Sequence, residues 1–267
     1  APGSLSEDSV TIIMLDAQGN HVSMTTVFSS DNLDSTGSLC LDSAGHTYFA
    51  TSFVDWVNFG EHDLYSVGGS NIAVGQYNSG GWLWAVGAGG AGDSTVVDCD
   101  GRYGGGVAVV GDYLQNMTFG DVELQPAVWV DFYEAHVSAD GSWLHATGFG
   151  GAGADHAIAL HLTEQGDSII VGKSTATLVL GEFTLTDIDG INDGNHHDVF
   201  LGLREANASW DWAISAGGQG DDVPDTLGMS ATGSPVISFI SNDDGAYGMH
   251  AFDQRQHYDM GLWLYET

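Results

Sequence analysis

The chain has 267 residues, a length that fits one large β domain or two ordinary ones. Hydrophobic residues make up 43% and aromatic residues 10%, which is enough to bury a core and excludes a disordered polymer. The 36 Asp and Glu residues against 4 Lys and Arg give a formal net charge of −32, so we expect no binding of nucleic acid or anionic lipid. A scattered acidic surface of this kind suits a protein surrounded by salt or divalent cations.

Residues 1–35 are predicted to contain terminal strands. They open on "APGSLSEDS", which lacks the regions of a signal peptide, as in a processed secreted protein or a trimmed fragment. The segment Ser9–Phe28 aligns with the third and fourth strands of the repeat that follows, and it can also be aligned with the first and second. These strands either close a ring, with Asn20–Phe28 as the outer strand of the last repeat, or are donated to a neighbouring molecule. No apolar stretch in the chain is long enough to span a bilayer.

From Thr36 the chain alternates between short apolar strands and turns. In the first repeat the strand signals are "SLCLD", "TYFATSF", "NIAVGQYN" and "WLWAVGA", and "SAGH" and "SGG" are turns. No helical period occurs in this stretch. The pattern predicts four antiparallel strands in each repeat.

The same marks return about every 60 residues, which is typical of a repeat architecture. A glycine-rich hexamer occurs three times, and a W-x-x-A run precedes each copy. The hexamers lie at Gly89–Ser94, Gly150–Asp155 and Gly217–Asp222, and the W-x-x-A runs begin at Trp82, Trp143 and Trp210. We place the repeats at residues 36–92, 93–153, 154–220 and 221–267, as one domain.

This organisation predicts an all-β fold, a β-propeller of four-stranded antiparallel blades. About four blades are expected, with five also possible, and a terminal strand would close the ring. Each hexamer is interpreted as the crossing from the outer strand of one blade to the inner strand of the next. Glycine fits there because it allows positive φ and close backbone approach.

The order of the marks resembles the SBBP-type β-propeller repeat over about Thr36 to Glu266. The matching residues are "DSAGHTYFATSF" at Asp42–Phe53, Phe59-Gly60, Leu64, Asn71, Trp84-Ala85 and "GGAGD" from Gly89. Two features depart from the family pattern: the usual Lys of the third strand is absent from every repeat, and the last repeat lacks its Trp-Ala and glycine-rich section. The resemblance implies a propeller of a secreted bacterial or archaeal protein, with no catalytic signature.

The extra residues of the third repeat, "DIDGINDGNHHD", predict a calcium loop. Its oxygen ligands would be Asp187, Asp189, Asn192 and Asp193, although Ile191 replaces a third ligand and no Glu closes the loop. The alternative is an acidic, glycine-rich tip between strands. His196 and His197 are interpreted as surface histidines, because neighbours on a strand point to opposite faces and do not share one ion.

Several other residues are candidate contact or modification sites. The repeated tryptophans are expected to pack between blades, so Trp56 and Trp129, which fall off the repeat positions, are the candidates for an exposed ligand contact. Asn116 and Asn207 begin sequons that would accept glycans in an exported protein. Cys40 and Cys99 would form a disulfide only if their inner strands approach within about 7 Å.

No catalytic motif occurs, so we expect no enzyme. The first hypothesis is a non-catalytic module, extracellular or on the cell surface, that binds a protein or a glycan. The second is a structural subunit that assembles into a filament or surface layer by strand exchange. The third is a polysaccharide-active enzyme with acidic residues at the mouth of a central channel.

Overall fold

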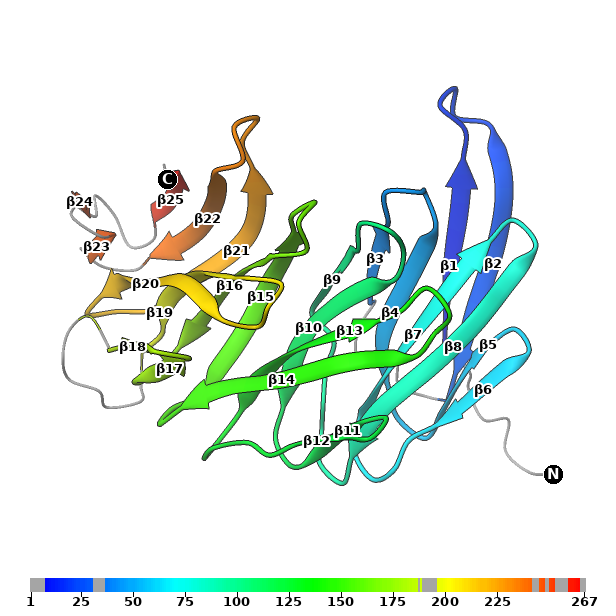
Figure 1. Ribbon diagram of the computed structural model, residues 1–267, viewed down its shortest axis with the longest axis horizontal. Helices are drawn as coiled ribbons and strands as arrows, with labels where there is room; N and C mark the ends of the chain where they lie inside the picture. The colour runs from blue at the N-terminus through cyan, green and yellow to red at the C-terminus, as the bar shows by residue number, and fades with distance from the viewer. Residues whose placement is uncertain are drawn as a thin grey trace. The chain divides into compact units, whose positions relative to one another are not determined.

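The computed structural model describes residues 8–30, 37–186, 188, 196–241, 245–247, 250–252 and 259–264. These residues form antiparallel β-sheets and contain no helix, as the turn-punctuated sequence predicts (Figure 1). Within this part of the chain there is accordingly no helix with the length and apolar character needed to cross a membrane.

The N-terminal strands form a four-stranded sheet with a hairpin of the first repeat. The order is β1-β2-β5-β6, with β1 (Asp8–Leu15), β2 (His21–Ser29), β5 (Trp56–Phe59) and β6 (His62–Tyr65). Phe28 and Ser29 of β2 pair with Asn58 and Val57 of β5. In the described residues, the segment expected to complete the last repeat therefore pairs with the first repeat. Donation of β1 to another molecule stays a prediction.

Three six-stranded sheets follow, and each combines four strands of one repeat with a hairpin of the next. The first has the order β12-β11-β8-β7-β4-β3 and comprises β3 (Ser38–Leu41), β4 (Thr47–Phe53), β7 (Asn71–Asn78), β8 (Gly81–Gly90), β11 (Met117–Phe119) and β12 (Val122–Leu124). The second has the order β18-β17-β14-β13-β10-β9 and comprises β9 (Asp98–Gly101), β10 (Val107–Tyr113), β13 (Asp131–Val137), β14 (Trp143–Gly151), β17 (Leu178–Leu180) and β18 (Phe183–Leu185).

The third six-stranded sheet has the order β15-β16-β19-β20-β23-β24. It comprises β15 (Asp155–Leu162), β16 (Ser168–Ser174), β19 (Asp198–Arg204), β20 (Trp210–Gly218), β23 (Gly245–Tyr247) and β24 (His250–Phe252). The last repeat contributes a three-stranded sheet, β21-β22-β25, made of β21 (Asp222–Met229), β22 (Pro235–Ser241) and β25 (Asp259–Leu264).

The hairpin that extends each sheet explains the aromatic-Gly mark of the repeat. The β5–β6 hairpin pairs with β2 of the preceding sheet, while its Phe59 packs edge-on against Trp82 of β8, with ring centroids 4.8 Å apart. Phe119 and Trp143 repeat this contact at 4.9 Å. The repeated tryptophans therefore hold a hairpin against the sheet of their own repeat.

The glycine hexamers allow close approach rather than unusual backbone conformation. A Cβ on Gly150 would lie 2.0 Å from Oδ1 of Asp131, and one on Gly151 would lie 1.9 Å from the carbonyl oxygen of Thr177, which precedes β17. Neither glycine has a positive φ. The expectation of positive φ at the hexamers is therefore wrong, whereas that of close approach is correct.

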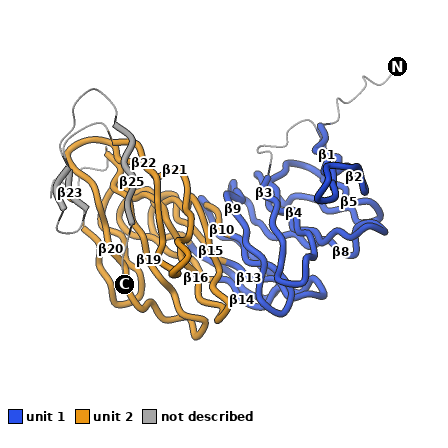
Figure 2. The backbone as a smooth tube through the Cα atoms, turned by 90° about the horizontal axis from the view of Figure 1, so that it is seen from above, with its two compact units in different colours: residues 1–109, 113–125, 135–146 blue, residues 110–112, 126–134, 147–267 orange. Residues whose placement is uncertain are grey.

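The chain divides into two compact units (Figure 2). Unit 1 comprises residues 1–109, 113–125 and 135–146, and unit 2 comprises residues 110–112, 126–134 and 147–267. Each has an apolar core between facing sheets. Unit 1 packs Val27, Phe49, Phe53, Val57, Phe59 and Ala73, and unit 2 packs Ile169, Val171, Val199, Leu201, Ile237 and Phe239. Full burial of such a side chain stabilises the fold by about 1.5–3 kcal/mol.

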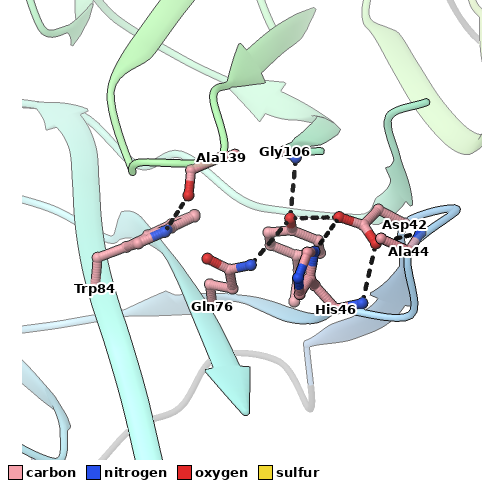
Figure 3. Close-up of polar contacts among 8 residues, drawn as sticks. Asp42, Ala44, His46, Gln76, Trp84, Gly106 and Ala139 are labelled. Atoms are coloured by element: carbon pink, nitrogen blue, oxygen red, sulfur yellow. Dashed lines mark hydrogen bonds and ion pairs between the residues drawn. The ribbon is translucent and has the colours of Figure 1, made fainter. Parts of the chain in front are cut away.

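The Asp-x-x-Gly-x-x-Tyr mark of the first repeat is a hydrogen-bonded turn (Figure 3). Oδ1 of Asp42 accepts from the amides of Ala44 and His46, both at 2.9 Å, and Oδ2 accepts from the hydroxyl of Tyr48 at 2.9 Å. The amide of Gly106 donates to the same hydroxyl oxygen at 2.9 Å. Burial, together with the nearby Asp42 carboxylate, raises the pKa of Tyr48 to about 12. These hydrogen bonds therefore fix the β3–β4 turn and join it to the backbone at Gly106, just before β10.

Candidate functional site

The candidate sites from the sequence are placed at different points of the chain. Asp187, Asp189, Asn192 and Asp193 lie outside the described residues, so the calcium loop stays a prediction. Asn116 and Asn207 are both exposed, and their side-chain amides donate to Glu123 at 2.7 Å and to Glu205 at 3.0 Å.

The two cysteines are joined in unit 1. Cys40 of β3 and Cys99 of β9 form a disulfide, with Cα atoms 6.0 Å apart. This separation is within the range that a disulfide needs. The inner strands of consecutive repeats therefore come closer at this position than the sequence alone could establish.

Trp56 and Trp129, the tryptophans outside the repeat positions, differ in exposure. Trp129, in the loop before β13, is 67% exposed, beside the equally open Val128. Trp56, at the start of β5, is half-buried. Of the two, Trp129 has the surface that a ligand contact requires.

A groove of about 360 Å³ lies beside the β5–β6 hairpin in unit 1. Tyr65 and Val67 line it and are 72% and 71% exposed. Leu64, the glycine-rich segment Gly87–Gly89 of β8 and the exposed Thr118 of β11 also line it. Sequence reasoning missed Tyr65, because this position has no aromatic residue in the other repeats and carries no repeat mark.

A second set of polar residues lies where each hexamer leads into the next repeat. The first residue of β7 and that of β19 each accept a hydrogen bond, through a side-chain oxygen, from the loop that precedes the strand. The Val67 amide donates to Asn71 at 2.7 Å, and the Ile188 amide donates to Asp198 at 2.7 Å. Ala127 donates to Asp131 in the same way. This contact persists in the third repeat although its loop is longer.

The residue that ends each hexamer lies at the same junction. Its amide donates to the carbonyl oxygen of the residue just before β7, β13 or β19. The three hydrogen bonds, each 2.8 Å long, run from Ser94 to Ser70, from Asp155 to Val130 and from Asp222 to His197. In the first repeat the Ser94 hydroxyl also donates to the Ser70 carbonyl at 3.0 Å. The first repeat therefore has neutral residues, Asn71 and Ser94, at the two positions where the second and third repeats each have an aspartate, while its Asp93 accepts from the Ser70 amide at 2.9 Å. We call Asp131 and Asp155 the second junction.

The second junction is deeply buried in unit 2. Asp131 is 2% exposed and Asp155 is fully buried. In the part of the chain that the structure describes, Oδ1 of Asp131 and both carboxylate oxygens of Asp155 have no hydrogen-bond partner, although the Gly151 amide lies near enough to lower the pKa of Asp155. Burial, followed by repulsion from Asp131, raises the pKa of Asp155 to about 7. Burial also raises the pKa of Asp131.

Two histidine–aspartate pairs flank the buried aspartates in unit 2. Nδ1 of His156 lies 2.7 Å from Oδ2 of Asp112, and Nδ1 of His197 lies 2.9 Å from Oδ1 of Asp221. Burial lowers the pKa of His197, against the opposing effect of its hydrogen bond to Asp221. The sequence interpretation of His197 as a surface histidine omitted this partner, which lies 24 residues away in the chain.

Comparison with known proteins gives little to add to this geometry. No protein-family profile and no curated protein matches the chain. Among solved structures, the chain is similar to a protein of unknown function from Bacteroides caccae, with a TM-score of 0.40 and 10% sequence identity, over 86% of this chain and 68% of that one. A similarity at this level supports no statement about fold or function.

Proposed function

We propose that the chain is a non-catalytic, extracellular β-propeller module that binds a neutral glycan. The observation that carries the proposal is the groove that the exposed Tyr65 and the exposed Thr118 both line. The apolar face of an aromatic ring packs on the C–H surface of a sugar, while hydroxyl groups bind the sugar's edge. The net charge of −32 disfavours sulfated or uronic-acid polymers, so an uncharged ligand fits best.

Two further observations support the extracellular location. The Cys40–Cys99 disulfide is typical of proteins that fold in an oxidising compartment. The sequon residues Asn116 and Asn207 are exposed and would be accessible to glycosylation. In each of the first three repeats, four antiparallel strands lie side by side in one six-stranded sheet, which supports the propeller architecture.

The test of the glycan site is a binding measurement with matched tyrosine variants. Affinity electrophoresis against neutral polysaccharides, such as mannan and β-glucan, should show retardation that Tyr65→Ala reduces by about tenfold in affinity. Tyr103→Ala removes another exposed tyrosine of unit 1 and should leave binding unchanged. Binding that survives Tyr65→Ala, or retardation by no polysaccharide, contradicts the proposal. Binding of a purified unglycosylated protein at Tyr65 would instead favour a protein ligand.

One observation favours a second function, self-assembly into a filament or layer. The β1–β2 hairpin exposes apolar side chains on one surface, including Ile13, Leu15, Val22 and Met24. In the described residues β1 is also at the edge of its sheet, so its backbone is available for pairing. Deletion of residues 1–16 should then abolish oligomers in analytical ultracentrifugation. An intact protein that stays monomeric at high concentration would rule this function out.

A further inference from the structure

The second junction brings together carboxylate oxygens with no cationic partner among the described residues. Among the described residues, both oxygens of Asp155 and Oδ1 of Asp131 are buried and have no hydrogen-bond partner, with the Gly151 amide nearby. The Val130 carbonyl already accepts the Asp155 amide at 2.8 Å, and it is the equivalent of the Ser70 carbonyl, which accepts a second hydrogen bond from Ser94. A carboxylate at the Ser94 position has no such hydrogen to donate when it is ionised.

No ion pair compensates these carboxylates in the residues that the structure describes. Neither Asp131 nor Asp155 forms an ion pair in the described part of the chain, and the neighbouring His156 is paired with Asp112. Arg204, the buried arginine of unit 2, is paired with Glu134 at 2.7 Å. Two buried carboxylates without a counter-charge are costly, because desolvation of each ion opposes folding.

We infer that a divalent cation of the calcium type binds between Asp131 and Asp155, with backbone carbonyl oxygens completing its shell. Calcium accepts irregular sets of carboxylate and carbonyl oxygens, whereas magnesium requires near-octahedral geometry and keeps more of its water. The charge of the ion balances the two carboxylates. This site is separate from the calcium loop predicted at Asp187–Asp193.

The same pair of residues recurs in the third repeat, which supports a built site rather than an accident of one junction. A Cβ on Gly217 would lie 1.8 Å from Oδ1 of Asp198 and 3.1 Å from Oδ2 of Asp222. The two carboxylates therefore face the same point beside the hexamer. The first repeat has the neutral residues Asn71 and Ser94 in these two places.

The test is calcium titration of the full-length protein by calorimetry, in about 0.5 M NaCl so that exposed charges are screened. The variant Asp131→Asn/Asp155→Ser copies the residues of the first junction. It should bind one calcium ion fewer per chain than the native protein and show a smaller rise in melting temperature between EDTA and CaCl₂. The control Glu164→Gln/Asp211→Asn removes two exposed carboxylates and should bind as the native protein does.

Two outcomes would overturn the inference: a native protein that binds no calcium in this buffer, or a junction variant that binds as many ions with the same affinity. If the double variant does not fold, Asp155→Asn alone keeps the shape of the side chain, and it should weaken one calcium site by about tenfold or more. An unchanged titration of Asp155→Asn would again contradict the site.

Discussion

Units 1 and 2 contain the same repeat but bury different polar groups. Among its described residues, unit 1 buries one acidic side chain, Asp42, which accepts four hydrogen bonds, and a disulfide joins two of its strands. Unit 2 buries six Asp, Glu and Arg side chains in its described part: Asp131, Glu134, Asp155, Asp198, Arg204 and Asp222.

The difference shows that the buried charges are not needed to build the repeat. The first repeat has Val74 where the second has Glu134, and Asn71 and Ser94 where the second has Asp131 and Asp155. β7 and β13 begin at Asn71 and Asp131 in the two repeats, and the isolated β-bridge at Ser94 stands where β15 begins at Asp155. Buried charges oppose folding unless they are compensated, and within the described part of unit 2 Glu134 and Arg204 compensate each other whereas Asp131 Oδ1 and both Asp155 oxygens have no partner.

The largest expected effect is the loss of one partner of the buried ion pair in unit 2. Arg204→Met leaves Glu134 buried without its 2.7 Å partner and should lower the free energy of unfolding by about 3–5 kcal/mol. Urea unfolding followed by tryptophan fluorescence measures this change. The double variant Glu134→Val/Arg204→Met, with the valine of the first repeat, should recover more than half of the loss. No recovery would mean that the pair contributes through packing rather than charge.

The corresponding change in unit 1 removes its covalent cross-link. Cys40→Ser/Cys99→Ser opens a loop closed over 59 residues and should lower stability by about 2–4 kcal/mol. Thermal unfolding of the native protein with and without reductant measures the same effect independently. Equal melting temperatures in all three samples would show that unit 1 does not depend on the disulfide.

The stability of the protein should depend on pH through Asp155 of unit 2. In EDTA, folded Asp155 keeps its proton to about pH 7, whereas the unfolded chain loses it near 3.8, so its stabilising contribution is present at low pH and is lost as pH rises through 7. Relative to Asp155→Ser, the native protein should therefore lose stability on the order of 3–4 kcal/mol between about pH 4 and pH 7. Melting curves of both proteins across this range test the sign, and parallel pH profiles would contradict it.

The smallest expected change in stability concerns a turn that occurs in both units. Ala208 has a φ of 77° in the β19–β20 turn of unit 2, where the β1–β2 turn of unit 1 has Gly19 with a φ of 82°. Ala208→Gly should stabilise unit 2 by about 0.5–1 kcal/mol, because glycine adopts this conformation without strain. Gly19→Ala, which has open space around its Cβ position, should destabilise unit 1 by about the same amount. Changes of the same sign in both variants would contradict this explanation.

The sequence predicted local features well and pairing between distant segments poorly. The strands, turns and repeat period followed from alternating apolar residues and glycine spacing, which depend on nearby residues. The pairing of β5 with β2 did not follow, because a hairpin of four-residue strands gives no signal for its partner. The second junction was also missed, because Asp131 and Asp155 are two of 36 acidic residues and only the fold distinguishes them by burial. An alignment of Asn71, Asp131 and Asp198 by repeat was the signal that could have found it.

The pairing of each hairpin with the preceding sheet has a consequence for how such a chain can change its length. The segment 93–153, cut at its glycine hexamers, carries the β11–β12 hairpin away from β8 and leaves β14 without β17. A single excised repeat would therefore expose two sets of unpaired backbone groups, and it should not fold as an isolated fragment. Duplication or loss of a repeat during evolution keeps these pairings only when the remaining hairpin meets an equivalent strand. The repeat of the sequence is thus offset by one hairpin from the six-stranded sheet that repeats in the structure.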